Sequence, residues 1–449
     1  MASFSTVNPA TGEQLSKFDH VTWEQAELMI LDAKKDFEKW RKYSFAERSK
    51  VLNNLAASLR KHSDDLALQM HLEMGKLIPE GKAEVEKCAI TCEYYAKEAA
   101  GMLANQKSAS PYKDAEVSFS PLGVIFSVMP WNFPLWQVLR FAAPSLMAGN
   151  VIILKHADLT AGVSEKIGQI FKDLTSDLTL LRNCQVDHTV AEKIISHPMV
   201  RGITFTGSTE GGRAVATTAA KNLKKIVLEL GGSDAYIVLE DADIYKAAKA
   251  CAKTRLQNCG QSCVAGKRFI VVEKVLQEFL TAMEHEMKIL PLAPLASKRF
   301  QDTIITQVEK LKNWGGKVIF GGTAPQGPAA FYPASLVLFE KNNSDVHHEE
   351  VFGPVALVFV AKDATEAMEI ANSSPYGLGG GIFTRDLQKG KELIEKEMEA
   401  GFVVVNDFVK SDPRIPFGGV KDSGYGRELG HFGIMEFVNI KTVGVGAVE

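Results

Sequence analysis

One cysteine of the sequence stands where its side chain can project into a cleft. Cys263 comes after a helical pattern over 241–256 and a glycine-marked turn, and it precedes a predicted strand. A thiolate is a strong nucleophile, and a turn between two elements leaves such a side chain accessible. The same pattern also fits a small buried side chain, which is what most cysteines are. The residues alone leave both interpretations open.

Glu229 and Asn132 are candidates for the other groups that a covalent reaction needs. Glu229 lies inside the apolar run 227–230, where burial would raise its pKa and suit it to act as a general base. Simple alternation would instead turn it toward solvent. Asn132 lies in the proline- and aromatic-rich segment 130–134, where its amide can donate to a developing oxyanion or merely occupy a turn.

A fourth segment has the pattern of a phosphate-binding turn. A predicted strand ends in Gly207-Ser208, and a helical pattern over 209–220 follows. Backbone N–H groups at such a helix start can bind phosphate. The segment lacks the G-x-G-x-x-G fingerprint, so taken alone it has low specificity. Together the four segments indicate a nucleophile, a base, an oxyanion donor and a phosphate site.

The elements that position these residues alternate between strands and helices. The first hundred residues are mostly helical, with apolar spacing that predicts helices over 22–42, 46–62 and 82–103. Alternation of strands and helices thereafter predicts parallel sheets in two α/β lobes, with a boundary near 231–232. The predicted strands cover 124–129, 151–154, 202–205, 225–230 and 235–239, then 269–272, 318–320, 355–360, 380–383 and 402–405.

Composition excludes several classes of protein. The 449 residues include 54 acidic and 51 basic side chains, so a net charge of −3 gives no electrostatic reason to expect a nucleic-acid partner. No apolar run approaches the roughly 18 to 20 residues of a membrane span, so no membrane partner is expected. The start resembles no secretory signal, and the six cysteines are expected to be free thiols, which predicts a cytoplasmic protein. No metal site is predicted.

Beyond these features, the sequence resembles the aldehyde dehydrogenase superfamily from residues 8–12 to the tail. The resemblance implies an α/β fold with a Rossmann-like cofactor domain, an α/β catalytic domain and a small β oligomerisation element. The strongest matching segments are 130–134, 205–208, 229–232, 260–263, 350–354 and 416–424. The implied domains are 1–102 with 122–230 for NAD(P) binding, 231–418 for catalysis, and 103–121 with 419–449 as the bridging element of a homodimer or homotetramer.

The resemblance also implies a reaction. Cys263 would attack an aldehyde to give a thiohemiacetal, whose oxyanion the Asn132 side chain and the Cys263 backbone N–H would hold. Hydride transfer to the nicotinamide would leave a thioester, which water activated by Glu229 would hydrolyse. These roles agree with those inferred from the residues.

The cofactor residues are implied one by one. An acid three residues beyond Lys155 is typical of relatives that prefer NAD, because it can bond a 2′-hydroxyl and repels a 2′-phosphate; Asp158 therefore predicts NAD as the preferred cofactor, with NADP possible. The cofactor-binding residues implied are Trp131, Lys155, Asp158, Gly207, Ser208, Gly231, Glu350 and Phe352.

Arg140 bears on the substrate. It follows Asn132 by eight residues, about two helical turns, and resembles an arginine of succinate semialdehyde dehydrogenases, and the run 257–269 resembles the short bacterial branch of that group. Arg140 would clamp a distal carboxylate, with Ser411 as a second contact, unless it forms a surface salt bridge. The predicted substrate is succinic semialdehyde. The alternatives are a broader aliphatic or glutaric semialdehyde dehydrogenase and, in a different class, a thiol esterase.

Overall fold

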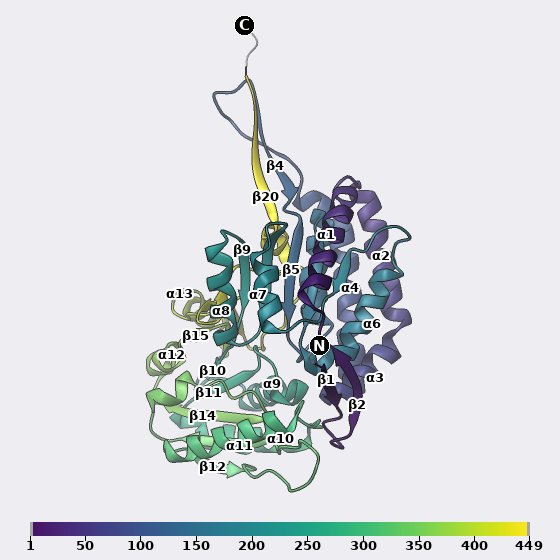
Figure 1. Ribbon diagram of the computed structural model, residues 1–449. Coiled ribbons are helices and arrows are strands. Elements are labelled where there is room, and N and C mark those ends of the chain that lie inside the picture. The colour runs from purple at the N-terminus through teal and green to yellow at the C-terminus, as the bar shows by residue number, and fades with distance from the viewer. Residues whose placement is uncertain (1–2, 447–449) are drawn as a thin grey trace.

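Two mostly parallel sheets form the two lobes of the protein. The computed structural model describes residues 3–446 (Figure 1). The first sheet has the order β19-β9-β8-β5-β6-β7 and is parallel except for β19 at its edge. Its strands are β5 (Val124–Met129), β6 (Val151–His156), β7 (Leu181–Asn183), β8 (Val200–Thr206), β9 (Lys225–Glu229) and β19 (Gly424–Tyr425).

Helices cover the first sheet and extend away from it. All residues of α5 (Trp136–Ala148) are buried, so this helix forms part of the core instead of the surface. The helix α4 (Ile78–Met102) packs along it, and α2 packs on α4. The remaining elements of this lobe are β1 (Ser3–Val7), β2 (Gln14–Asp19), α1 (Trp23–Trp40), α2 (Phe45–Lys61), α3 (Ser63–Met74), η1 (Asp158–Thr160), α6 (Ala161–Lys172), α7 (His188–Ser196), α8 (Thr209–Lys221) and α14 (Gly430–Met435).

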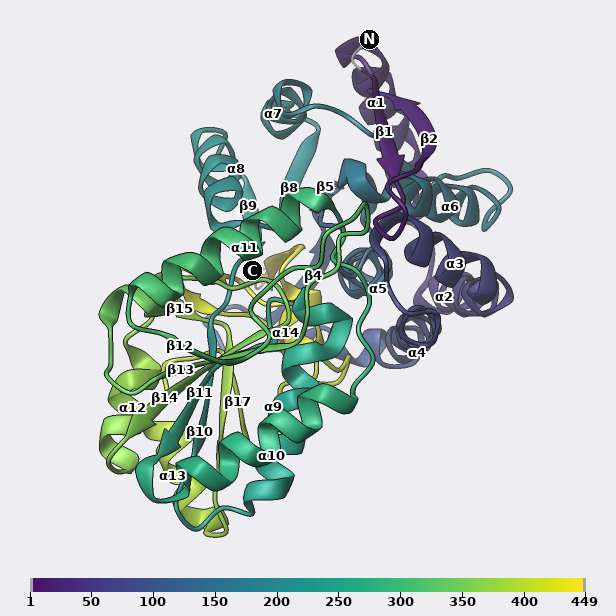
Figure 2. The same ribbon diagram turned by 90° about the horizontal axis from the view of Figure 1, so that it is seen from below.

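The second sheet has the order β12-β13-β14-β11-β10-β16-β17, with only β12 antiparallel. Figure 2 shows its strands between two groups of helices, and two buried apolar clusters join α9 and α10 to one face and α11, α12 and α13 to the other. The strands are β10 (Asp234–Val238), β11 (Gly266–Val272), β12 (Lys317–Phe320), β13 (Ser335–Phe339), β14 (Val355–Ala361), β16 (Gly379–Phe383) and β17 (Phe402–Val405). The helices are α9 (Ile244–Leu256), η2 (Gln257–Gly260), η3 (Glu273–Val275), α10 (Leu276–Ile289), α11 (Lys298–Asn313), η4 (Ser344–His348), α12 (Ala364–Asn372) and α13 (Leu387–Lys396).

A third sheet forms an arm that leaves the body of the molecule (Figure 1). It has the order β20-β4-β3, from β3 (Gln106–Lys107), β4 (Asp114–Pro121) and β20 (Val438–Val445). The two long strands pair antiparallel, from Val438 opposite Pro121 to Val445 opposite Asp114. Within the chain these two strands pair with each other, and their role in joining subunits stays a prediction. A short two-stranded ladder of β15 (Tyr376–Gly377) and β18 (Val420–Lys421) lies apart from this arm.

The α/β class and the strand positions predicted from the sequence are confirmed. Each predicted strand corresponds to an observed one with ends shifted by a few residues, and β13 and α3 are two elements that the sequence analysis missed. Within residues 3–446, no helix is long and apolar enough to cross a membrane.

The site residues meet because of how the two sheets face each other. Asn132 follows β5, Ser208 follows β8 and Glu229 ends β9, so all lie at the carboxyl ends of the first sheet. Cys263 precedes β11 and Glu350 precedes β14, at the amino ends of the second sheet. In α/β sheets, ligands bind at the carboxyl ends of the strands where the strand order reverses, as it does here on either side of β5. This edge is therefore where a ligand is expected.

Candidate active site

The loop that carries Cys263 has an unusual backbone. Asn258, Cys259 and Gly260 take φ values of 52°, 55° and 74°, so three consecutive residues are left-handed. Such a conformation costs on the order of 1 kcal/mol for each residue with a side chain, so the surrounding contacts must hold it. Gly260 packs so closely that a Cβ there would lie 2.3 Å from the Gly353 carbonyl oxygen. The loop is thereby fixed in the shape that presents the cysteine.

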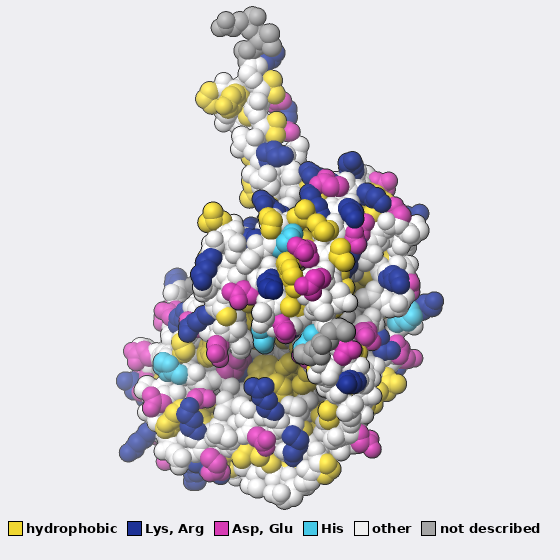
Figure 3. Space-filling model, viewed as in Figure 1, with side chains coloured by type: hydrophobic (Ala, Val, Ile, Leu, Met, Phe, Trp, Pro, Cys, Tyr) yellow, Lys and Arg dark blue, Asp and Glu magenta, His cyan; other side chains and the backbone are white. Residues whose placement is uncertain are grey.

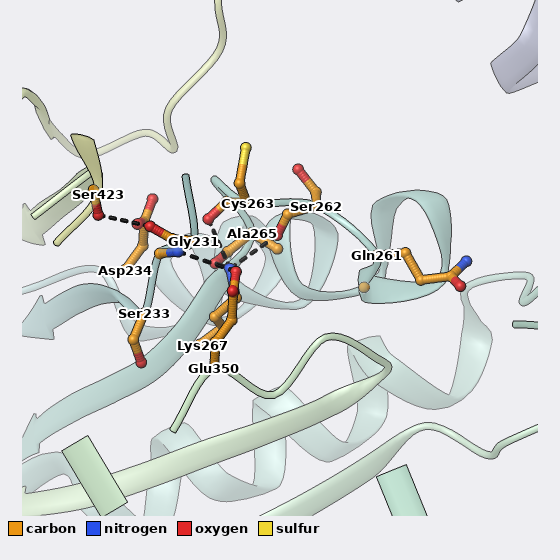
Figure 4. Close-up of polar contacts among 12 residues, drawn as sticks. Gly231, Ser233, Asp234, Gln261, Ser262, Cys263, Ala265, Lys267, Glu350 and Ser423 are labelled. Carbon is orange, nitrogen blue, oxygen red and sulfur yellow. Dashed lines mark hydrogen bonds and ion pairs between the residues drawn. The ribbon is translucent and has the colours of Figure 1, made fainter. Parts of the chain in front are cut away.

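Lys267 supports this loop from beneath. Its ammonium donates to the backbone carbonyls of Ser262 (2.8 Å), Cys263 (2.7 Å) and Ala265 (3.3 Å). The same ammonium lies 3.6 Å from the Glu350 carboxylate. Figure 4 shows the Cys263 thiol pointing away from this cluster. Sequence reasoning missed Lys267 because it lies two residues before the predicted strand 269–272, where a lysine is usually exposed to solvent.

Cys263 differs from the other five cysteines in exposure. All six are free thiols, and Cys263 alone is half-buried, while the others are buried. Cys259 packs into the apolar cluster of the second lobe. Burial raises the pKa of Cys263 to about 12, and the nearby positive charges of Arg140 and Lys267 act against that rise. The thiol is accessible, yet it needs activation to become a nucleophile.

Asn132 is buried beside this loop. Its side-chain Nδ2 donates to the Gln261 carbonyl oxygen at 3.1 Å. The backbone carbonyl oxygen of Asn132 accepts from the Lys76 ammonium at 2.9 Å and from the Asn258 side chain at 2.8 Å. The buried Lys76 forms an ion pair with Glu84, whose other oxygen accepts the first N–H groups of α5. Neither Lys76 nor Glu84 was singled out in the sequence. Lys76, which is held by Glu84, thus fixes the backbone of Asn132 next to the loop that carries Cys263.

Glu229 is fully enclosed. Neither carboxyl oxygen has a hydrogen-bond partner among residues 3–446, and the side chain is 2% exposed. Burial raises its pKa well above the ordinary value, the Glu428 carboxylate raises it further, and Arg140 opposes both effects. A carboxyl group whose pKa is raised in this way accepts a proton more readily than an exposed one, which suits it to act as a general base. The buried interpretation of Glu229 is thereby confirmed over the solvent-facing one.

Arg140 lies in the active-site cavity with a partner that the sequence did not reveal. It is 2% exposed and forms an ion pair with Glu428, while its guanidinium donates to Thr206 at 3.3 Å and lies 4.9 Å from the Phe417 ring. The ion pair is buried, not the surface salt bridge considered as the alternative. Because Glu428 already balances its charge, a substrate carboxylate would have to compete for this arginine. The clamp role stays a prediction.

One cavity joins the nucleophile to the candidate substrate residues. It has a volume of about 230 Å³ and is lined by residues of α4, α5, the nucleophile loop and the segment after β17. Cys263, Arg140 and Ser411 all contribute to its wall. Trp136, Phe133 and Phe417 supply apolar surface. The cavity can therefore hold a short apolar chain with a polar end.

The cofactor candidates form a second group along the sheet edge. Ser208 caps α8, where its hydroxyl accepts the Gly211 N–H at 3.2 Å, and a Cβ on Gly207 would lie 2.8 Å from the Phe205 ring. Lys155 at the end of β6 is buried, and burial lowers its pKa. The start of α8 after β8 and the buried cation at the end of β6 lie on either side of β5, an arrangement that fits a dinucleotide's phosphates and ribose.

The candidates for holding the nicotinamide end of the cofactor include Glu350, which lies at the amino end of a strand of the second sheet. Glu350 accepts the Gly232 N–H at 3.0 Å, and a Cβ on Gly231 would lie 2.5 Å from its carboxylate, so the glycine permits this approach. The rings of Trp131 and Phe352 meet edge to face with centroids 5.9 Å apart. Figure 3 shows a hollow lined with hydrophobic side chains between the lobes. These residues fit a bound NAD or NADP.

Asp158 is the first residue of η1, which begins two residues after the end of β6. Its carboxylate accepts from Gln185 at 2.5 Å and lies 3.2 Å from Nε2 of His20. Its side chain is 42% exposed, so it keeps acceptor capacity toward a ligand. No cluster of three or more His, Cys, Asp or Glu side chains suited to a metal ion occurs within the described part of the chain.

The fold and the site define a class of enzyme that forms a covalent intermediate on a thiol. The aldehyde dehydrogenase family model matches residues 2–443. A Synechocystis protein named probable succinate-semialdehyde dehydrogenase (NADP(+)) is 41% identical over 98% of this chain and 99% of that protein. An Escherichia coli protein named succinate semialdehyde dehydrogenase (NAD(P)+) is 38% identical over 98% of this chain and 97% of its own length.

A solved structure gives the same result. The succinic semialdehyde dehydrogenase of Streptococcus pyogenes, in complex with NADP+, superposes with a TM-score of 0.95 at 33% identity, over 99% of this chain and 100% of that one. The chain belongs to the aldehyde dehydrogenase family, and it is an NAD(P)-dependent enzyme that oxidises an aldehyde to a carboxylate. The preference for NAD predicted from Asp158 is not supported, because the relatives' names point toward NADP.

Proposed function

We propose that this dehydrogenase oxidises succinic semialdehyde to succinate. The observation that carries the proposal is the cavity that Cys263 shares with cationic side chains and Ser411. A short aldehyde with a distal carboxylate has the shape and charge for it. The names of the relatives from Synechocystis, Escherichia coli and Streptococcus pyogenes support the same substrate.

Each catalytic residue has one role in the proposed reaction. The Cys263 thiol gives its proton to solvent and its sulfur adds to the aldehyde carbon, and the Asn132 amide and the Cys263 backbone N–H hold the resulting oxyanion. Bound NAD(P) supplies the hydride acceptor. Glu229 then takes a proton from the water that attacks the thioester, which releases the carboxylate and restores the Cys263 thiol. Burial of Glu229 and Asn132 beside the cysteine loop supports these roles.

The cofactor is proposed to lie across the facing edges of the two sheets. Lys155 would bond the adenosine ribose, and Gly207 with Ser208 would bind the pyrophosphate at the start of α8. Glu350 would hold the nicotinamide ribose, which Gly231 leaves room for, with Trp131 and Phe352 beside the ring. Strand membership supports a cofactor domain from 1–102 and 122–230 and a catalytic domain over 231–418.

The β4–β20 arm, within 103–121 and 419–449, is proposed to join subunits of a homodimer or homotetramer. Its projection from the body supports this role (Figure 1). Exposed apolar side chains on β20, Ile440, Val443 and Val445, provide surface for such contacts. We also propose a cytoplasmic location, because the cysteines of the described chain are free thiols.

Asp158 is proposed to set the choice between NAD and NADP. Replacing it with serine is expected to raise kcat/KM for NADP relative to NAD by about tenfold, because the change removes a negative charge that repels a 2′-phosphate. Initial rates with both cofactors measure the ratio. Asp173→Ser on the exposed end of α6 is the matched control. An unchanged ratio in Asp158→Ser would remove this residue from cofactor selection.

The substrate proposal is tested by reduced-nicotinamide production with succinic semialdehyde, glutaric semialdehyde, acetaldehyde and an aromatic aldehyde. The highest kcat/KM is expected for succinic semialdehyde with either cofactor. A preference for glutaric semialdehyde, or equal values for the neutral aldehydes, would contradict the proposed substrate and leave the family's activity intact. Ester hydrolysis without any aldehyde oxidation would instead identify a thiol esterase.

A further inference from the structure

A lysine in the active-site cavity has no carboxylate partner. Lys87 on α4 lines the cavity together with Cys263. Its ammonium lies 4.0 Å from the Trp136 ring centroid and donates to the Ser411 hydroxyl at 2.7 Å. None of the ion pairs within residues 3–446 includes Lys87. A half-buried cation without a counter-ion is costly, so it favours binding an anion.

The other cations of the cavity wall are already paired. Arg140 forms its ion pair with Glu428. Lys410 donates to both carboxylate oxygens of Asp407 at 2.8 Å. Lys87 is therefore the cation of this wall whose charge is not balanced by direct contact.

The acidic residues of the wall are also engaged elsewhere. Glu84 pairs with Lys76 and accepts the backbone N–H groups at the start of α5 at 2.9 and 2.8 Å. Glu80 accepts the backbone N–H of Asn258 at 3.0 Å. Neither carboxylate is bonded to Lys87, although both lie on the same helix.

We propose that Lys87, with the Ser411 hydroxyl that it holds, binds the distal carboxylate of the substrate. This assignment rests on the proposed function, in which the substrate carries such a group. The Ser411 oxygen accepts from Lys87, so its own hydrogen is free to donate in the same direction. An ammonium and a hydroxyl side by side offer a carboxylate one donor for each oxygen. Trp136 forms the apolar backing of the pair.

The surroundings of Lys87 agree with this role. The titratable and charged groups that face it are Glu84 and Cys88 on α4, Arg140 on α5 and Asp412 in the loop after β17. Burial, with a smaller contribution from Arg140, lowers the pKa of Lys87 to about 8, while Cys88, Glu84 and Asp412 act against that fall. A bound carboxylate would favour the protonated form. Affinity for an anionic aldehyde should therefore fall as the pH rises through about 8.

The test compares Lys87→Met with wild type on succinic semialdehyde and on butanal, which lacks the carboxylate. KM for succinic semialdehyde is expected to rise about 10- to 100-fold, with kcat and the KM for butanal changed little, because one charge-assisted contact is lost. Lys87→Arg should recover most of the affinity and move the alkaline loss of affinity to higher pH. Lys82→Met, on the exposed side of the same helix, is the matched control.

Two further variants separate this role from others. Ser411→Ala should raise KM for succinic semialdehyde by a smaller factor, about 3- to 10-fold, and leave butanal unaffected. For Arg140→Lys, an equal effect on both aldehydes would assign Arg140 to holding Glu428 and Glu229, whereas a rise in KM for succinic semialdehyde alone would assign the clamp to Arg140 as well. If Lys87→Met lowered kcat for both aldehydes equally, the residue would have a structural role and the proposal would be overturned.

Inhibition of butanal oxidation by succinate distinguishes failure of the inference from failure of the proposed substrate. If succinic semialdehyde is a poor substrate, yet succinate inhibits competitively in wild type and not in Lys87→Met, the anion site stands and the proposed substrate is wrong. If succinic semialdehyde is preferred and Lys87→Met keeps the preference, the substrate stands and the site is wrong. If succinate inhibits neither protein and no preference exists, both fail.

Discussion

Cys263→Ser is expected to lose at least about 10³-fold in kcat while still folding and binding the cofactor. Serine keeps the size of the side chain but gives a hydroxyl that ionises far less readily than a thiol, so addition to the aldehyde fails. The loop that presents residue 263 is held by Lys267 and by the packing of Gly260, and neither depends on the sulfur. Stopped-flow measurement of reduced-nicotinamide formation tests the loss, and calorimetric titration with NAD and NADP tests binding.

Chemical modification provides the control for this variant. Cys263 is the half-buried cysteine and the other five are buried, so iodoacetamide should label it first in the folded enzyme. Labelling should be slow at neutral pH and should quicken as pH rises, because burial raises the pKa of the thiol. Peptide mass spectrometry identifies the site. Activity that survives full labelling of Cys263, or a serine variant with nearly normal kcat, would remove it from the reaction.

The strands that carry the site residues follow from local sequence patterns, so the positions of these residues could be predicted from the sequence. Asn132, Ser208 and Glu229 each lie at the end of a short apolar run, and such runs became β5, β8 and β9. Carboxyl ends of neighbouring parallel strands meet at one edge, so predicting the strands was enough to bring these residues together. The cysteine was placed by the same reasoning at the start of β11.

The partners of these residues come from contacts that no local pattern encodes. Lys87 lies in a helix that was predicted, yet a single lysine on an amphipathic helix is usually solvated. Its place in the cavity depends on α4 packing against α5 and on Ser411, far along the chain. The partner of Arg140 is likewise distant, since Glu428 comes from the segment before α14. Charge pairing across such separations is fixed only by the tertiary fold.

Two secondary-structure elements were missed for a more local reason. α3 is separated from α2 only by His62, and its end is marked by Gly75 in the left-handed conformation. The predicted helix over 46–62 ends where α2 does, and no capping side chain marks the start of α3 at Ser63. β13 is a five-residue buried run, mostly apolar, next to the edge strand β12 of the second sheet. Short buried runs have no periodicity that separates strand from helix.

Glu229→Gln is expected to keep the first turnover and lose the later ones. Hydride transfer should still give a burst of reduced cofactor equal to the number of active sites, after which the steady-state rate falls about 10²- to 10⁴-fold because no base activates water on the thioester. Glutamine has the same shape, so the cavity and the positions of Arg140 and Glu428 should be kept. Rapid-mixing kinetics with succinic semialdehyde resolves the two phases.

The pH dependence of wild type and variant gives an independent readout. Steady-state activity of wild type should rise with pH as Glu229 loses its proton, over a range displaced upward because burial raises its pKa. In Glu229→Gln this limb should disappear. Hydroxylamine, which attacks a thioester without a base, should restore turnover in the variant more than in wild type. The absence of a burst would contradict the assignment to deacylation and would place Glu229 in the step that activates Cys263.

Although Glu229→Gln is expected to lower activity, it should not lower the stability of the folded enzyme at pH 8. The pKa of Glu229 is raised in the folded state above its ordinary value of 4.5, so folding favours the protonated carboxyl. Its contribution to stability is full below that ordinary value and is lost as pH rises through the folded-state pKa. At pH 8 the unfolded chain has lost this proton, so the folded wild type loses stability whether it retains the proton or buries the charge, and glutamine has neither cost. Thermal unfolding at pH 8 should give Glu229→Gln a Tm equal to or above that of wild type, whereas a lower Tm would show that the charge stabilises the fold through Arg140.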